Sequence, residues 1–255
     1  MKTTFLGTGT SLGVPIIGCK CGVCRSRDVR DKRQRSSVLV EIDGRNIIID
    51  TGPDFRAQCL SNNIEHIDAI LVTHPHRDHI AGLDDIRPFC YIQKQYIPVY
   101  ASPSTCNAIQ HDYSYCFATP KYPGVPDIEL HQIKNYIPFD AAGIQVTPFP
   151  VMHAKMEVTA YRFRNFTYIT DAWQISEESV NAAKGTQYLV VNALRKEPHP
   201  SHFNLEQALD FIATIKPEHA YLTHIGHSLG YEETQAILPP NVQMAYDGLS
   251  ITIPD

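Results

Sequence analysis

Short apolar runs separated by turn residues recur along the whole chain. Most are rich in Val, Ile, Leu, Tyr or Phe and four to six residues long, a pattern typical of buried β-strands. They predict strands at about residues 2–6, 37–42, 46–50, 68–73, 97–100, 144–149, 158–163, 166–170, 187–192, 219–223 and 243–246.

Helical patterns are fewer, and they lie between the later strands. They predict helices at about residues 78–89, 103–111, 175–184 and 204–215. The last has the clearest signals, because Asn204 and Gln207 have the spacing of a capping box and Lys216-Pro217 ends the apolar stripe. Strands are grouped in the first half and alternate with helices later. This order predicts an α/β fold in which helices cover the sheets.

Reactive side chains directly follow four of the predicted strands: Asp50, His74, Asp171 and His224. In α/β folds, ligand sites collect beyond the carboxyl ends of strands. The segment 187–223 reads as strand, helix, strand. A right-handed crossover there would place His202 at the same sheet edge as His224. The pattern therefore predicts one site built from several separate segments.

Length and composition fit one large domain over residues 1–255. The chain is 43% hydrophobic, which excludes global disorder, and its net charge of −5 argues against a basic surface for nucleic acid. No stretch approaches the roughly 18–20 apolar residues of a membrane span. Residues 1–7 are too short an apolar run for a secretion signal, so a cytoplasmic location is expected.

Charged residues are concentrated at 25–35, and tyrosines and prolines at 111–126. The charge run predicts a solvated loop or short helix, or alternatively a rim that attracts an anionic substrate. Residues 111–126 predict an irregular surface excursion. This second segment is not expected to be a linker between domains.

Three histidines and an aspartate fall within six residues in the string Thr73-His74-Pro75-His76-Arg77-Asp78-His79. Alternate residues of an extended loop point the same way, so His74 and His76 can bind one ion. Asp78 and His79, where the chain turns into a helix, can face a second. Imidazole and carboxylate ligands suit Zn, Mn or Fe.

This H-x-H-x-D-H string resembles the signature of the metallo-β-lactamase superfamily. Further superfamily elements follow in order from residue 3 to about 250: Ile47-Ile-Ile-Asp50-Thr-Gly52, Pro150-Val-Met-His153-Ala-Lys155, Asp171 and Thr223-His224-Ile-Gly-His227. The resemblance implies an αββα sandwich of two mixed sheets covered by helices. It also implies a site with two divalent metal ions, zinc or manganese.

The resemblance assigns the ligands of both ions. His74, His76 and His153 would hold one ion, Asp78, His79 and His224 the other, and Asp171 would bridge them, with Asp50 supporting the site. Asp78, in addition to being a ligand, and His202 are the candidate catalytic residues. His202, in Pro200-Ser-His202, resembles the proton-donating histidine of the family, and His199 is a rival for that role.

The branch is indicated by Asp171, where lactamase-type members place Cys, and by the start Thr4-Phe-Leu-Gly-Thr-Gly-Thr10. Both resemble the phosphodiesterase branch, which includes ribonuclease Z and phosphoribosyl cyclic phosphate phosphodiesterase. The crowding of Cys19, Cys21 and Cys24 predicts metal binding before disulfides. By resemblance to the cyclic phosphate enzyme, these cysteines and His227 form a structural zinc site. The other four cysteines are expected to be small buried hydrophobes or free thiols.

The expected function is hydrolysis of a small cyclic phosphodiester, such as 5-phosphoribosyl 1,2-cyclic phosphate or a related nucleotide. One alternative is a ribonuclease Z-like RNA 3′-processing endonuclease, which usually carries a long arm between the residues equivalent to His153 and Asp171. These are only 18 positions apart here. The other alternative is a non-hydrolytic protein like that of quinone-cofactor biosynthesis. Membrane and nucleic-acid partners are not expected, and a homodimer is left open.

Overall fold

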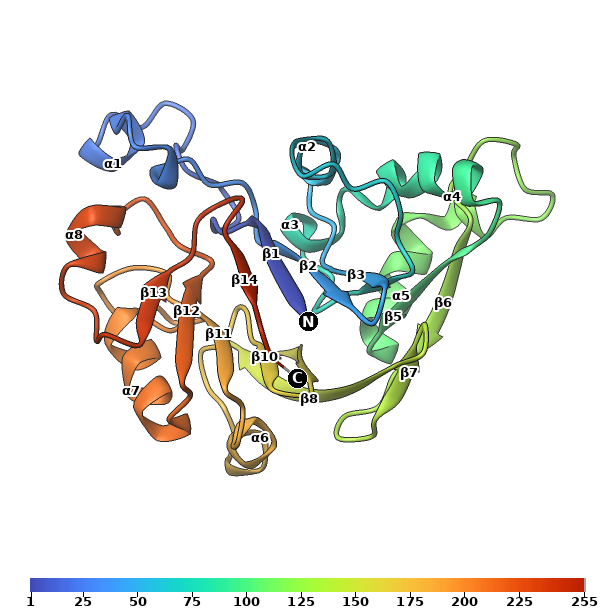
Figure 1. Ribbon diagram of the computed structural model, residues 1–255. Helices are drawn as coiled ribbons and strands as arrows, with labels where there is room; N and C mark the ends of the chain where they lie inside the picture. Colours follow the sequence, from blue (N-terminus) through green and yellow to red (C-terminus); the bar gives the residue numbers. More distant parts are fainter. Residues whose placement is uncertain (255) are drawn as a thin grey trace.

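Two mixed β-sheets lie face to face at the centre of the structure, a computed structural model that describes residues 1–254 (Figure 1). The first sheet contains β1 (Lys2–Gly7), β2 (Ser37–Ile42), β3 (Arg45–Ile49), β4 (Ala69–Leu71), β5 (Ile97–Ala101), β6 (Ile128–Gln132) and β14 (Ser250–Thr252). Its strand order within the described residues is β14-β1-β2-β3-β4-β5-β6. Neighbours from β14 to β3 are antiparallel, and those from β3 to β6 are parallel.

The second sheet has the same mixture of directions. It contains β7 (Phe139–Ala141), β8 (Ile144–His153), β9 (Met156–Phe163), β10 (Phe166–Tyr168), β11 (Tyr188–Asn192), β12 (His219–Thr223) and β13 (Val242–Met244). Strands β7 to β10 pair antiparallel and β10 to β13 pair parallel, in the order β13-β12-β11-β10-β9-β8-β7.

Helices cover the outer face of each sheet, which gives four layers. The helices are α1 (Gly22–Arg25), α2 (Phe55–Ser61), α3 (Arg77–Ile80), α4 (Arg87–Gln93), α5 (Pro103–Asp112), α6 (Glu177–Ala183), α7 (Leu205–Ile215) and α8 (Tyr231–Gln235), with 3₁₀ turns η1 (Val29–Asp31), η2 (Leu83–Ile86) and η3 (Ser114–Cys116). α2 to α5 share a core with the first sheet, and α6 to α8 share one with the second. The predicted αββα sandwich is confirmed.

Alternation along the strands produces these layers. Val38 and Val40 pack between the sheets with Tyr161 and Phe163, whereas Leu39 points to the opposite face, toward the helices. Successive side chains of a strand point to opposite faces, so a strand buried on both faces reads as a continuous apolar run. Burial of each such side chain stabilises the fold by roughly 1.5–3 kcal/mol.

The connection from β11 through α7 to β12 agrees with its sequence signals. The Asn204 side chain accepts a hydrogen bond from the backbone N–H of Gln207 at 2.9 Å, and the Gln207 side chain accepts one from that of Asn204 at 3.0 Å. This reciprocal pair is the predicted capping box. β11 and β12 are parallel, so the loop before α7 lies at the carboxyl ends of both strands.

The prediction of one helix over 78–89 was wrong. The chain there forms α3, η2 and α4 in succession. The His79 carbonyl accepts a hydrogen bond from the Thr51 N–H at 2.8 Å, and the Gly82 N–H donates to the Thr51 carbonyl at 2.8 Å. Thr51, which is distant in sequence, therefore forms hydrogen bonds with backbone groups that a continuous helix would pair within itself. Strands β6, β7 and β14 were also missed.

The charge run at 25–35 is not wholly solvated. Arg33 is buried, and its Nη1 donates to Thr8 Oγ1 at 2.9 Å and to the Ala245 carbonyl at 2.6 Å. Asp31 is also buried and accepts a hydrogen bond from the Tyr231 N–H at 2.9 Å. Asp31 thus ties the segment around α1 to the start of α8 (Figure 1), and Arg33 ties it to the chain after β1 and after β13, a role that neither expectation included.

The predicted excursion at 111–126 is largely irregular after the end of α5, apart from η3. No helix within residues 1–254 combines the length and apolar character needed to cross a lipid bilayer.

Candidate metal centre

The predicted site residues lie together at one edge of the two sheets. Asp50 follows β3, and His74 follows β4 after two residues, both in the first sheet. His153 ends β8, Asp171 follows β10 and His224 directly follows β12, all in the second sheet. The site therefore spans the seam between the two sheets, at the edge where these strands end.

Three histidines form one part of the cluster. His74 Nε2 lies 3.1 Å from His76 Nδ1. The ring of His153 lies 5.1 Å from that of His76 and 5.8 Å from that of His74, measured between centroids. The structure thus brings together the three residues expected to hold the first ion.

Asp78, His79, His224 and Asp171 form the other part. His79 Nε2 lies 3.2 Å from Asp78 Oδ2 and 3.3 Å from Asp171 Oδ2. His224 Nε2 lies 3.2 Å from Asp171 Oδ1. Asp171 also lies within 4.8 Å of the ligand atoms of His74 and of His153, so its carboxylate adjoins both ion sites, as a bridging ligand requires.

Asp50 and Thr73 fix the orientation of two of the imidazoles. His79 Nδ1 donates to Asp50 Oδ2 at 2.7 Å, and Thr73 Oγ1 donates to the same oxygen at 2.8 Å. Since the only hydroxyl proton of Thr73 is used there, its oxygen accepts from His74 Nδ1 at 3.0 Å. Both rings therefore carry their proton on Nδ1, and the Nε2 lone pairs point into the site. This arrangement is common around metal-binding histidines.

Two further histidines are oriented in the same way. His153 Nδ1 donates to the Ser201 carbonyl at 2.7 Å. Ser36 Oγ donates to the Gly9 carbonyl at 2.9 Å and lies 3.3 Å from His224 Nδ1, from which it accepts. Four separate outer contacts thus occupy the Nδ1 atoms, and the metal-binding side of each of these rings is Nε2.

The surroundings of one buried atom are consistent with a bound cation. His79 Nε2 is buried and has no hydrogen-bond partner within the described residues, although two carboxylate oxygens lie nearby. A buried nitrogen lone pair that faces carboxylates is unfavourable without a positive charge between them. The imidazole and carboxylate donors suit divalent transition metals. The cluster is therefore consistent with a dinuclear metal site.

Electrostatics favour the metal-binding forms of Asp171 and His224, whereas the carboxylates around His79 outweigh its burial and raise its pKa well above the usual range. Burial alone would raise the pKa of Asp171, but His224, His79 and the hydrogen bond from His202 outweigh it and hold this pKa well below its usual range. Burial lowers the pKa of His224 to about 4. Asp171 is thus ionised and His224 neutral at physiological pH, which are the protonation states that bind metals.

The local backbone is unusual at three site residues. Asp50, Asp171 and His224 have φ values of 63°, 56° and 53°, in the left-handed region. Such conformations cost energy in non-glycine residues and cluster at functional sites. Gly52 is needed for a different reason, since a Cβ there would lie 2.2 Å from the Asp78 carbonyl. Its lack of a side chain lets the Asp50 loop approach the loop that carries Asp78.

His202 also reaches the cluster. Its Nε2 lies 2.8 Å from Asp171 Oδ1, and its ring stacks on that of His224 at 5.1 Å. His199 lies one layer further out, with its Nδ1 3.2 Å from His202 Nδ1. Only His202 of this pair therefore contacts the carboxylate of the site. The distance to Asp171 is compatible with a proton donor and with a metal ligand.

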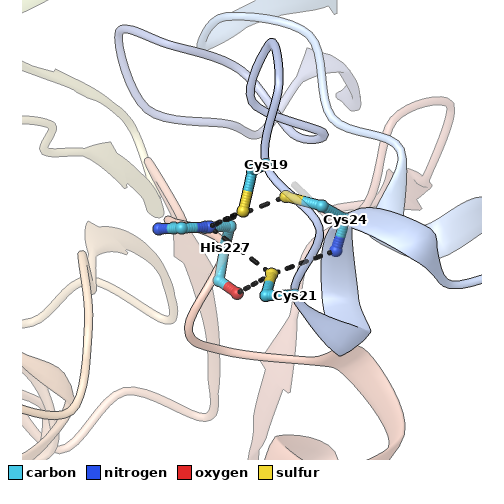
Figure 2. A group of neighbouring side chains, drawn as sticks. All are labelled: Cys19, Cys21, Cys24 and His227. Carbon is cyan, nitrogen blue, oxygen red and sulfur yellow. Dashed lines mark hydrogen bonds between the residues drawn. The ribbon is translucent and has the colours of Figure 1, made fainter.

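A second cluster lies in the segment around α1 (Figure 2). The sulfur atoms of Cys19, Cys21 and Cys24 lie 3.3, 3.5 and 3.6 Å from His227 Nδ1. Three thiols and one imidazole that converge in this way can hold a zinc ion in a closed tetrahedral site. A hydrogen bond from the Cys24 backbone N–H lowers the pKa of Cys21 to about 6, against the effect of burial. Cys21 is thus largely a thiolate at neutral pH.

Comparison with known proteins identifies the family. Residues 45–225 match the family model described as the β-lactamase superfamily domain. A crystal structure of a new diphosphatase from the PhnP family superposes with a TM-score of 0.92 and 41% sequence identity, covering 98% of this chain and 96% of that one. The chain belongs to the metallo-β-lactamase superfamily and, within it, to the PhnP family. The predicted resemblance to the phosphodiesterase branch is confirmed.

Two other proteins are similar to this chain over nearly its whole length. A Porphyromonas gingivalis protein named octanoyltransferase is 40% identical over 256 residues, which are 99% of this chain and 52% of that protein. The chain thus spans about half the length of that relative. Zinc-bound PqqB from Methylobacterium extorquens has a TM-score of 0.82 at 21% identity, covering 99% of this chain and 100% of that one. At that identity the likeness shows a shared fold.

The structure also shows where the remaining cysteines and Lys155 lie, and which residues orient the histidines of the site. Cys59, Cys90, Cys106 and Cys116 are buried, which agrees with the first of the two expectations for them. Lys155, a weaker candidate for phosphate binding, is exposed on the turn after His153. Sequence reasoning missed Thr73 and Ser36. Thr73 directly precedes His74, so its position next to the motif could have indicated its role. Nothing in the sequence around Ser36 indicates that it contacts His224.

We predict that Cys21→Ser removes one zinc ion per chain and lowers the melting temperature, while kcat falls much less than in variants of the His/Asp cluster. A closed site contributes folding energy rather than chemistry. Metal analysis, thermal unfolding and steady-state kinetics measure the three quantities. Cys59→Ser is the control, because it alters a buried thiol outside the cluster and should keep the metal content unchanged. A wild-type protein with no metal beyond two ions per chain would contradict this prediction.

Proposed function

We propose that the protein is a dinuclear metal-dependent phosphodiesterase that hydrolyses a small cyclic phosphodiester, of the class of 5-phosphoribosyl 1,2-cyclic phosphate or a related nucleotide. The observation that carries the proposal is the position of Asp171. Its carboxylate lies beside His79 and His224 of the second ion site and within 4.8 Å of the ligand atoms of His74 and His153 of the first. One of its oxygens also contacts His202. This arrangement combines a metal pair with a nearby proton donor around one carboxylate.

His74, His76 and His153 would hold one ion, Asp78, His79 and His224 the other, and Asp171 would bridge them. Zinc or manganese ions in these sites would supply Lewis-acid charge to a phosphate and lower the pKa of water. His202 Nε2 would protonate the leaving oxygen. Asp171 holds that ring nitrogen toward the site at 2.8 Å. Cys19, Cys21, Cys24 and His227 would hold a structural zinc ion.

The chain between His153 and Asp171 favours a small substrate over RNA. In the described residues this interval consists of β9, β10 and short connections, with no inserted arm. The acidic net charge of −5 also disfavours a long polyanion. A non-hydrolytic role is disfavoured for a different reason, because every expected ligand position holds a His or Asp.

The similarity to a diphosphatase of the PhnP family supports a second candidate substrate class, diphosphate esters. Hydrolysis of a phosphoanhydride and of a phosphodiester requires the same groups, a nucleophilic water and charge stabilisation at phosphorus. The leaving group differs: a phosphate departs without a proton more easily than a ribose alkoxide does. The two classes are therefore separable by their dependence on His202.

A substrate panel tests the proposal. We expect the highest kcat/KM on a cyclic ribose phosphate, lower values on linear bis-aryl phosphates, and no turnover of a lactam or a thioester. The panel should also contain cyclic nucleotides and a diphosphate ester, with Mn and Zn supplied separately. Electrophoresis should show no binding of a transfer-RNA precursor. Preferred hydrolysis of the lactam or thioester, or tight binding of the precursor, would overturn the proposal.

A further inference from the structure

Two thiols of the Cys/His cluster differ in their access to solvent. Cys21 is half-buried and lines a groove of about 510 Å³ between α1 and α8. Cys24, three residues further along the chain, is buried. A small reagent that enters the groove therefore reaches Cys21 directly, while Cys24 is accessible to it only through the cluster.

Cys21 and Cys24 are placed to react with each other. Both sulfur atoms point toward His227 Nδ1, at 3.5 and 3.6 Å, and the Cys24 backbone N–H donates to Cys21 Sγ at 3.4 Å (Figure 2). The ligand atoms of the cluster all lie within 4.8 Å of one another, so the two sulfurs need to approach by less than about 3 Å to reach bonding distance. The Cys-x-x-Cys spacing is also that of the dithiols in disulfide oxidoreductases.

The cluster joins two segments that are distant in sequence. Three of its members come from residues 19–24, and His227 comes from the segment after β12. The cysteine loop is also held from within, because the Ile16 N–H donates to Cys24 Sγ at 3.4 Å. A closed zinc site needs all four ligands. A bond between Cys21 and Cys24 would remove two of them and would therefore separate the two segments.

Both segments also position a ligand of the metal centre. His227 follows His224 by three residues, and residues 8–10 lead into the cysteine loop. Residues 8–10 exchange two backbone hydrogen bonds with Ile225, at 2.9 and 3.2 Å. Their central carbonyl accepts from Ser36 Oγ at 2.9 Å, and Ser36 Oγ lies 3.3 Å from His224 Nδ1. Separation of the two segments would therefore loosen the support of this imidazole.

We propose that the cluster is an oxidation site, at which hydrogen peroxide joins Cys21 and Cys24 in a disulfide, releases the zinc ion and slows hydrolysis at the metal centre. The inference rests on the structural zinc ion of the proposed function.

The chemistry takes two steps. The Cys21 thiolate attacks one peroxide oxygen, so that an S–O bond forms, the O–O bond breaks, and the other oxygen leaves as water after taking a proton. The Cys24 thiolate then attacks the oxidised sulfur, and the S–O oxygen leaves as water with a second proton. The two sulfurs lose two electrons, and the peroxide gains them.

The test treats wild-type enzyme, loaded with zinc in the cluster and manganese in the metal centre, with a small excess of hydrogen peroxide. We expect the loss of one zinc ion per chain, full retention of manganese, and a disulfide between Cys21 and Cys24 in peptide mapping. The kcat/KM for bis(p-nitrophenyl) phosphate should fall roughly 10-fold, the scale on which a lost outer contact of a metal ligand acts. A dithiol reductant with added zinc should restore the zinc content and the activity.

Two variants control the test. Cys59→Ser should respond to peroxide as the wild type does, because this thiol lies outside the cluster and lines a separate groove at α2. Cys21→Ser lacks the reacting thiol, so peroxide should not lower its kcat/KM further.

Four outcomes would overturn the proposal: zinc release without a disulfide, a Cys21–Cys24 disulfide in a protein that keeps its zinc, zinc release with unchanged kcat/KM, or an equal loss of activity in Cys21→Ser. The last would mean that peroxide acts at the metal centre itself. Zinc content and disulfide are measured without substrate. A protein that hydrolyses no phosphodiester would therefore overturn the proposed function, and the zinc and disulfide results would still decide whether the cluster is an oxidation site.

Discussion

Asp171→Ala is expected to lower kcat/KM by orders of magnitude on any phosphodiester that the protein hydrolyses. The carboxylate is buried, its oxygens lie near His79 Nε2 and His224 Nε2, and it lies within 4.8 Å of the ligand atoms of His74 and His153. Its loss removes the bridge between the two ion sites. The metal content should therefore fall below two catalytic ions per chain, which metal analysis of the purified variant measures beside the kinetics.

Two variants control this experiment. Asp171→Asn keeps the size of the side chain and one carbonyl oxygen, so it should retain more metal than Asp171→Ala. Asp210→Ala removes an exposed carboxylate on α7 and should change neither metal content nor activity. Full activity in an Asp171→Ala protein with verified metal content would end the two-metal interpretation. Unfolding temperatures of all three variants separate loss of the site from loss of the fold.

Local signals made much of the fold predictable. The capping box of Asn204 and Gln207, and the double-sided apolar strands such as Ser37–Ile42, depend on neighbours in sequence. The helix over 78–89 failed because Thr51, from another segment, takes the His79 carbonyl. β14 is only three residues long and exists through its pairing with β1, where Thr3 faces Ile251. Contacts between segments this far apart in sequence cannot be predicted from local sequence patterns.

In the candidate site, too, features set by neighbouring residues were predictable, and features set by distant residues were not. The spacing of residues 74–79 alone predicted a metal cluster, and the structure brings these side chains together. Ser36, which orients His224, lies 188 positions away from it, and no pattern links the two. The charge run at 25–35 gave one wrong expectation. Arg33 was expected to be solvated, but it is buried and donates hydrogen bonds to Thr8 and Ala245. A charged residue with distant backbone acceptors cannot be distinguished from a surface residue by composition.

His202→Ala is expected to keep both catalytic metals and near-normal substrate binding while kcat falls roughly 10²- to 10⁴-fold, the usual scale of general acid catalysis. The reason is that His202 Nε2 faces the site through Asp171 Oδ1, whereas the seven expected ligands do not include it. The loss should depend on the leaving group. A substrate that releases p-nitrophenolate needs no proton, so its kcat should fall far less than that of a substrate releasing a ribose alkoxide.

His199→Ala is the matched control, because this ring contacts His202 but not Asp171. It should reduce kcat much less than His202→Ala on the ribose substrate. Equal losses on both leaving groups would show that His202 positions substrate or metal instead of donating a proton. An active His202→Ala together with an inactive His199→Ala would transfer the acid role to His199. Loss of metal from His202→Ala would make His202 a ligand, and the assignment of His224 would then need revision, because both rings lie beside the same oxygen of Asp171.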